Sequence, residues 1–204
     1  MHGEAETRRR LDPSERKRLL MQDAIKVFAR RGLGRAGHTE IAQLAGVSVA
    51  TVFNYFNTRD ILVNEVLDDV EQFLVHLAVT ALDAQTSPEE TLDRCIATFI
   101  SACHESPDYI KIWLEWSSSV REDTWPRYMA FQEYILTLIE KKIEMGIQSG
   151  TLSEGLPAAD RARWAIGNAH MLVTLVFNPN EFDEAAIRKL VTRGFAHILG
   201  IKAS

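Results

Sequence analysis

The chain has 204 residues and an ordinary composition, with 46% hydrophobic and 25% charged side chains and a net charge of −5. This length is enough for one large domain, or for a small domain attached to a larger one. No stretch approaches the roughly 18 to 20 consecutive apolar residues that a membrane-spanning helix needs, and the first residues lack the apolar core of a secretory signal. We therefore expect a protein of the cytoplasm that has no membrane partner.

The charge is distributed unevenly along the chain. Residues 1–60 carry 11 Lys and Arg against 7 Asp and Glu, a net charge of +4, which leaves −9 for residues 61–204. Affinity for DNA that does not depend on base sequence comes from neutralising phosphates. A basic head on an acidic body is therefore typical of a DNA-binding protein, although each of these residues taken singly could belong to a solvated surface.

Helix signals divide the chain into nine helices and indicate no strand, which predicts an all-α fold. Asp12-Pro13-Ser14-Glu15 marks the start of the first helix and Arg31-Gly32 marks its end. Two short helices flank Gly46, and Thr58 caps a long helix with an apolar residue every three or four positions. Later helices are expected at about 88–104, 107–118, 125–148, 157–177 and 182–199, with N-caps at Ser87 and Ser106. We expect a head of residues 1–58 and a body of residues 59–204.

The stretch TEIAQLAGVSVATVFNYFNTR, residues 39–59, has the pattern of a helix-turn-helix. Such a unit needs a small residue where its two helices touch, a turn, and a second helix that is free to enter a DNA groove. Ala45, Gly46 and Ser48 supply the close contact, the positive backbone angle and the helix cap. Val52 and Phe56 point inward from the second helix, which leaves an outer face of Ser48, Ala50, Thr51, Asn54 and Tyr55. The alternative is a simple corner between two helices.

Signatures of catalysis and metal binding are missing from the sequence. It contains no nucleophile elbow, no phosphate-binding glycine loop, no metal-ligand cluster and no nucleotide fingerprint. Cys95 and Cys103 fit neither a disulfide nor a zinc site, and we interpret them as small buried side chains. His104, His170 and His197 are isolated. We expect no cofactor, no metal and no enzymatic activity.

The last two predicted helices carry more apolar surface than docking on the body requires. Asn178-Pro179-Asn180 separates them and favours an antiparallel hairpin. Surplus apolar surface usually meets a partner, and a second copy could pack hairpin against hairpin as a four-helix bundle. The alternative is that the surplus is buried within one chain. The residues expected at the interface of a homodimer are Trp164, Leu172, Val176, Leu190, Phe195 and Ile198.

The sequence AIKVFARRGLGRAGHTEIAQLAGVSVATVFNYFNTRDILVNEVL resembles the DNA-binding head of TetR-family transcriptional regulators. More narrowly, it is similar to the LuxR/HapR/SmcR group of quorum-sensing master regulators, which are unrelated to the acyl-homoserine-lactone receptors that share the LuxR name. The narrower similarity rests on GHTEIAQLAGVSVATVFNYFNTR and, in the body, on IKIWLEWSSSVREDTWP, residues 110–126. The last hairpin resembles the group only in length and apolarity.

The resemblance implies an all-helical homodimer that binds pseudo-palindromic operators on double-stranded DNA. The helix from Val49 to Tyr55 would be the recognition helix, with Asn54 contacting a base, because its amide can pair with adenine. Phe53 stands where many TetR-type heads have a phosphate-binding tyrosine. The arginines before the first helix would lie in a minor groove or form a basic tail. The full set of expected DNA contacts is Arg8, Arg9, Arg10, Thr39, Ser48, Val49, Ala50, Thr51, Asn54, Tyr55 and Arg59.

Aromatic residues at helical spacing mark one region of the body. Such residues are more often part of a core than of a ligand site. The resemblance adds that the body of related regulators encloses an apolar cavity. We therefore expect a pocket for a small hydrophobic ligand, lined by Leu77, Trp113, Trp116, Phe131 and Tyr134.

The sequence thus favours a dimeric, sequence-specific transcriptional regulator of the quorum-sensing type. One alternative is a ligand-responsive TetR-type repressor of a local operon. Another is a helical adaptor that binds a second protein through its apolar hairpin. An adaptor has no need of a basic arm or of a polar outer face on the second motif helix, so these two features favour DNA binding.

Overall fold

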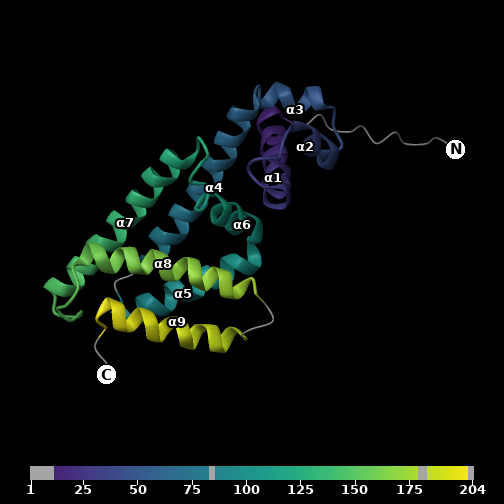
Figure 1. Ribbon diagram of the computed structural model, residues 1–204. Coiled ribbons are helices and arrows are strands. Elements are labelled where there is room, and N and C mark those ends of the chain that lie inside the picture. The colour runs from purple at the N-terminus through teal and green to yellow at the C-terminus, as the bar shows by residue number, and fades with distance from the viewer. Residues whose placement is uncertain (1–11, 83–85, 179–182, 202–204) are drawn as a thin grey trace. The chain divides into compact units, whose positions relative to one another are not determined.

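The computed structural model describes residues 12–82, 86–178 and 183–201. Within these ranges the chain forms nine α-helices and no strand, which confirms the all-α prediction (Figure 1). None of these helices combines the length and the apolarity that crossing a bilayer would demand. The chain divides into two compact units, residues 1–67 and 68–204, with the division inside helix α4.

The first unit contains α1 (Pro13–Arg31), α2 (His38–Ala45), α3 (Val49–Tyr55) and the beginning of α4 (Arg59–Leu82). The predicted caps are present. The carboxylate of Asp12 accepts the backbone N–H of Ser14, and the hydroxyl of Thr58 accepts that of Ile61. Apolar side chains at helical spacing form the core of this unit, including Leu20, Ala24, Val27, Phe28, Ile41, Val52, Phe56, Leu62 and Val66.

The second unit continues along α4 and adds α5 (Pro88–Glu105), α6 (Pro107–Trp116) and α7 (Trp125–Gln148). Ser87 caps α5 in a complete capping box with Glu90. Ser106 stands at the N-cap of α6, as the sequence predicts, with Pro107 at the first helical position. Its hydroxyl makes no capping bond, however, and its own N–H donates to the carbonyl of Ala102 at the end of α5.

Helix α6 ends two residues earlier than the sequence predicts. Ser117, Ser118 and Ser119 follow it, and each hydroxyl donates to a carbonyl of the last turn, on Leu114 or Glu115. Serine hydroxyls compete in this way for the backbone carbonyls that the next helical turn would use. The run of three serines therefore stops the helix.

Helices α8 (Ala158–Val176) and α9 (Glu184–Leu199) lie side by side and pack on α5 (Figure 1). Asp183 caps α9 by accepting the N–H of Ala186. The shared core of these three helices is formed by Leu92, Ile96, Ile100, Ala165, Leu172, Ile187, Val191 and Phe195.

A fully buried arginine ties the end of α9 to the loop that precedes α8. The guanidinium of Arg161 donates to three backbone carbonyls, those of Leu156 at 2.7 Å, Leu199 at 2.8 Å and Ser153 at 2.9 Å. Next to it, the carbonyl of Gly200 accepts the N–H and the hydroxyl of Ser153. Gly200 ends α9 in the left-handed conformation, with φ of 71°. Arg161 thus satisfies carbonyls that a helix end and a loop would otherwise leave without donors.

We expect Arg161→Met to lower the free energy of unfolding by about 3 kcal/mol, because three buried carbonyls lose a charged donor. Urea unfolding of the full chain measures this loss. Arg163→Met is the matched control, since Arg163 lies on the same helix with an exposed side chain that pairs with Asp160 at the surface. We expect a change below about 0.5 kcal/mol for the control. Equal losses in the two variants would contradict the role given to Arg161.

Candidate nucleic-acid interface and body cavity

The turn between α2 and α3 has the geometry that a helix-turn-helix requires. Gly46 ends α2 with φ of 65°, a conformation that favours glycine. The side chain of Ser48 accepts the N–H of Thr51 and so caps α3. Val52 and Phe56 are buried beneath α3, which fixes the side of the helix that faces the core.

The opposite side of α3 faces solvent. Ser48, Val49, Ala50 and Asn54 are exposed, whereas Thr51 and Tyr55 are half-buried. The hydroxyls of Ser48 and Thr51 lie 2.8 Å apart and bond to each other, so both already take part in the helix cap. Asn54, in contrast, lies on the exposed side of α3 with its side-chain amide. Thr39, in the first turn of α2, is exposed as well.

His38 supports this surface from below, a role that the sequence interpretation did not assign. Its ring is buried and stacks on Phe53, with the centroids 3.9 Å apart and the planes within 4°. Its Nε2 donates to the carbonyl of Phe56 at 2.6 Å, which fixes the tautomer because a carbonyl can only accept. His38 thus holds both the middle and the end of α3. Phe53 remains 44% exposed, which places an apolar ring on the surface.

The remaining predicted DNA contacts have mixed surroundings. Arg59 is exposed, but its guanidinium donates to the carbonyl of Leu33, in the loop between α1 and α2. A guanidinium has five N–H donors, so one such bond leaves others for a phosphate. Arg8, Arg9 and Arg10 lie outside the described residues.

A cavity of about 420 Å³ lies within the second unit. Its walls come from α4, α5, α7, α8 and α9, with Trp113 from α6, and most of the lining residues are apolar. Of the five residues predicted to line a pocket, Trp113 and Phe131 do so. Leu77, Trp116 and Tyr134 are not among the lining residues, and Tyr134 is 50% exposed on the surface of α7.

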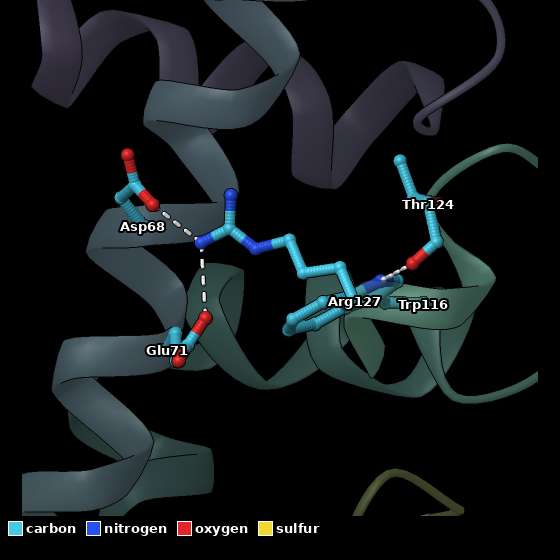
Figure 2. A network of polar contacts seen from close by, with 5 residues as sticks. All are labelled: Asp68, Glu71, Trp116, Thr124 and Arg127. Atoms are coloured by element: carbon cyan, nitrogen blue, oxygen red, sulfur yellow. Dashed lines mark hydrogen bonds and ion pairs between the residues drawn. The ribbon is translucent and has the colours of Figure 1, made fainter. Parts of the chain in front are cut away.

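Trp116 lies one layer behind the cavity wall. Its ring stacks on Phe131 at 5.6 Å and meets Tyr128 edge to face at 5.4 Å, and both of these partners line the cavity. Its Nε1 donates to the carbonyl of Thr124 (Figure 2). Trp113 thus lines the cavity and Trp116 packs behind its wall. Their spacing could not reveal this difference, because two residues three positions apart on a helix do not point in the same direction.

Arg127 connects this aromatic layer to α4. Figure 2 shows its guanidinium between the carboxylates of Asp68 and Glu71, the second at 2.9 Å. The guanidinium also lies 5.7 Å from the centre of the Trp116 ring, within the range of a cation–π contact. Contacts therefore run without interruption from the cavity lining, through Trp116, to the part of α4 that begins the second unit.

The residues predicted for a dimer interface fall into two groups. Leu172 and Phe195 are 2% and 7% exposed, because they face α5 and the cavity within a single chain. Trp164 and Leu190 are 58% and 45% exposed, and Val176 and Ile198 are half-buried. Part of the surplus apolar surface is thus buried within the chain, and part of it faces outward.

The isolated histidines and cysteines have ordinary environments. His170 packs against Trp113 at 4.2 Å, and burial lowers its pKa. Cys95 and Cys103 are free thiols, and Cys95 lines the cavity. Over the part of the chain that the structure describes, no His, Cys, Asp and Glu side chains are grouped in a way that could hold a metal ion.

Comparison with known proteins agrees with this geometry. Residues 20–66 match the model of the bacterial regulatory proteins of the tetR family. The HTH-type transcriptional regulator LuxR of Vibrio harveyi is 37% identical over 147 residues, which cover 72% of each chain.

Solved structures share the fold across both units. FadR of Bacillus subtilis, solved in complex with stearoyl-CoA, has a TM-score of 0.70 and 19% identity, covering 91% of this chain and 98% of its own. AibR, solved in complex with isovaleryl coenzyme A and operator DNA, has a TM-score of 0.72 and 15% identity, covering 92% and 100%.

The matched model spans the whole helix-turn-helix, and the similarity to LuxR extends well into the second unit. The members of this family are transcriptional regulators rather than enzymes. The chain therefore belongs to the tetR family of bacterial regulatory proteins and is a helix-turn-helix transcriptional regulator that binds DNA.

Proposed function

We propose that this regulator acts as a homodimer in the cytoplasm and recognises a pseudo-palindromic operator through the outer face of α3. The observation that carries the proposal is the arrangement of that helix, with Val52 buried and Asn54 exposed above a fixed turn. In this proposal residues 1–58 are the DNA-binding head, and residues 59–204 form the body for ligand binding and dimerisation.

The proposed contacts differ in kind. Asn54 reads a base in the major groove, and its neighbours Val49 and Ala50 contact apolar base edges. Tyr55 and Arg59 bind phosphate, together with Thr39, Ser48 and Thr51 at the ends of the two motif helices. Arg8, Arg9 and Arg10 form an arm that enters the minor groove.

We further propose that the regulator is of the quorum-sensing type. The support is the 37% identity to Vibrio harveyi LuxR, which covers parts of both units, together with the two sequence motifs that resemble that group. Chromatin immunoprecipitation with sequencing in the source organism tests this assignment. Bound sites spread over many promoters support a master regulator, whereas a single site beside its own gene favours a local repressor.

The local, ligand-responsive repressor is the second candidate, and the cavity is the observation that favours it. FadR and AibR were solved with acyl-CoA molecules, and both share the fold of this chain. A ligand can alter DNA binding only if it favours one conformation over another. The contacts from the cavity through Trp116 and Arg127 to Asp68 and Glu71 offer a route by which the cavity contents could bias α4.

The proposed dimer uses the exposed face of α8 and α9. Trp164, Gly167, Met171 and Thr174 are exposed at intervals of three or four along α8. On α9, Leu190 and His197 are exposed on one side. Two copies of this face can form a four-helix bundle around a two-fold axis, and the symmetry of a dimer would match that of a palindromic operator.

Asn54→Ala should cost about 1 to 3 kcal/mol on the preferred operator and should relax the base preference at one position of each half-site. Selection from a random DNA library followed by titration measures both effects. Asn57→Ala is the control, because it removes the same side chain from a position just beyond α3. An unchanged base preference in Asn54→Ala would exclude Asn54 as the residue that reads the base.

The double variant Trp164→Glu, Leu190→Glu should fold but sediment as a monomer, because carboxylates buried at the interface cost several kcal/mol. Its operator affinity should fall steeply, because a single head offers too few contacts. Val120→Glu is the control, since Val120 is an exposed apolar residue in the loop after α6. A double variant that remains dimeric would place the interface elsewhere.

A further inference from the structure

The charge of the cavity lining is opposite in sign to that of the body. Residues 61–204 carry a net charge of −9. Among the described residues that line the cavity, however, Lys142 is the one charged side chain, and neither Asp nor Glu is present. The carboxylates of the body are thus kept at its surface, while a cation reaches the cavity wall.

Most of the polar lining residues, Gln132 excepted, gather toward one end of the cavity. Thr86, Ser87, Thr91 and Cys95 come from α5 and the residues just before it, and Lys142, Ser149 and Thr151 come from the far end of α7 and just beyond. Arg94 adds a second cation close by, because its guanidinium donates to the hydroxyl of Thr86 at 2.9 Å. Burial raises the pKa of the Cys95 thiol to about 11, and the positive charges of Arg94 and Lys142 oppose this rise. Both cations therefore act on this part of the wall.

The other end of the cavity is mainly aromatic and apolar, with Gln132 next to Phe131 as its polar residue. Trp113, Tyr128 and Phe131 line it, and His170 packs on Trp113, where burial lowers its pKa and so disfavours the charged ring. Phe131 and Lys142 lie on the same helix, eleven positions apart. At the rise of an α-helix this separation is about 16 Å. The cavity is therefore long enough for an extended chain with one polar end.

We propose that the cavity binds a single-chain amphiphile with an anionic head group, such as an acyl chain ending in a carboxylate or joined to a phosphate-bearing carrier. The head lies beside Lys142, Thr91 and Cys95, and the chain extends toward Phe131 and Trp113. This inference rests on the proposed ligand-responsive function and specifies the class of ligand. A cationic head would meet like charge at Lys142, and an uncharged head would gain no ion pair there.

A series of ligands with one chain and different heads tests the assignment. Calorimetric titration of the dimeric protein compares dodecanoate, dodecanol and dodecyltrimethylammonium, each below its micelle concentration. Dodecanoate should bind about tenfold more tightly than the ammonium compound, as one charge-assisted contact would give. Equal affinities for all three, or preference for the ammonium compound, would overturn the proposal.

Charge reversal at Lys142 separates the site from a general surface effect. Lys142→Glu should weaken dodecanoate about tenfold and strengthen dodecyltrimethylammonium, because the charge at position 142 has changed sign. Lys141→Glu makes the same change at the preceding position of α7, which is exposed and does not line the cavity. Circular dichroism confirms that both variants are folded. The same shift in both variants would show that the head group binds outside the cavity.

Two further measurements identify the source of the head group and separate this proposal from the regulatory one. Tighter binding of dodecanoyl-CoA than of dodecanoate, still sensitive to Lys142→Glu, would identify a coenzyme A thioester, and the reverse order would identify a free acid. Operator affinity is then measured with saturating ligand. Binding that depends on Lys142 but leaves operator affinity unchanged would uphold the ligand class and refute ligand control of DNA binding.

Discussion

The ion pairs of Arg127 with Asp68 and Glu71 connect the cavity lining to helix α4. They would therefore couple ligand binding in the second unit to DNA binding. Helix α4 is the element that belongs to both units, and these two carboxylates stand at the point where it enters the second. On its other side, Arg127 contacts Trp116, whose ring packs on the cavity lining. A change of side-chain packing in the cavity can therefore reach α4 by displacing one aromatic ring and one guanidinium. Because these ion pairs are partly exposed, their strength depends on salt, so any coupling through Arg127 should weaken as ionic strength rises.

Much of the first unit could be predicted from the sequence because its signals are local. Gly46, Ser48 and Thr58 each act within one helical turn, and their types indicate where helices end and begin. The apolar spacing of Val52 and Phe56 then determined which side of α3 faces the core. His38 escaped notice because its two partners, Phe53 and Phe56, are fifteen and eighteen positions away. A stacked ring contact over that separation leaves no periodic pattern in the sequence.

The second unit was predicted less well because its helices are apolar on more than one side. The apolar content of α8 and α9 indicated more apolar surface than one buried face needs, but it could not assign residues to the inner and the outer face. Leu172 and Phe195 face inward, whereas Trp164 and Leu190 face outward. Tyr134 illustrates the same limit on α7, because it lies three positions from Phe131 but faces solvent. Lys142, on which the inferred head-group contact depends, looked like any charged residue of a solvated helix.

Two glycines that end helices share one backbone conformation but differ in the space around them. Gly46 and Gly200 both have positive φ, but no atom lies within 4 Å of a Cβ added at Gly46. At Gly200 such a Cβ would come within 2.5 Å of the Ser153 hydroxyl and 2.9 Å of the Arg161 guanidinium. Asparagine tolerates the left-handed conformation better than most residues do, so drift among related sequences could replace Gly46 by asparagine at little cost. Gly200 has no such substitute, because every other side chain would collide with the buried arginine and with the loop that it holds.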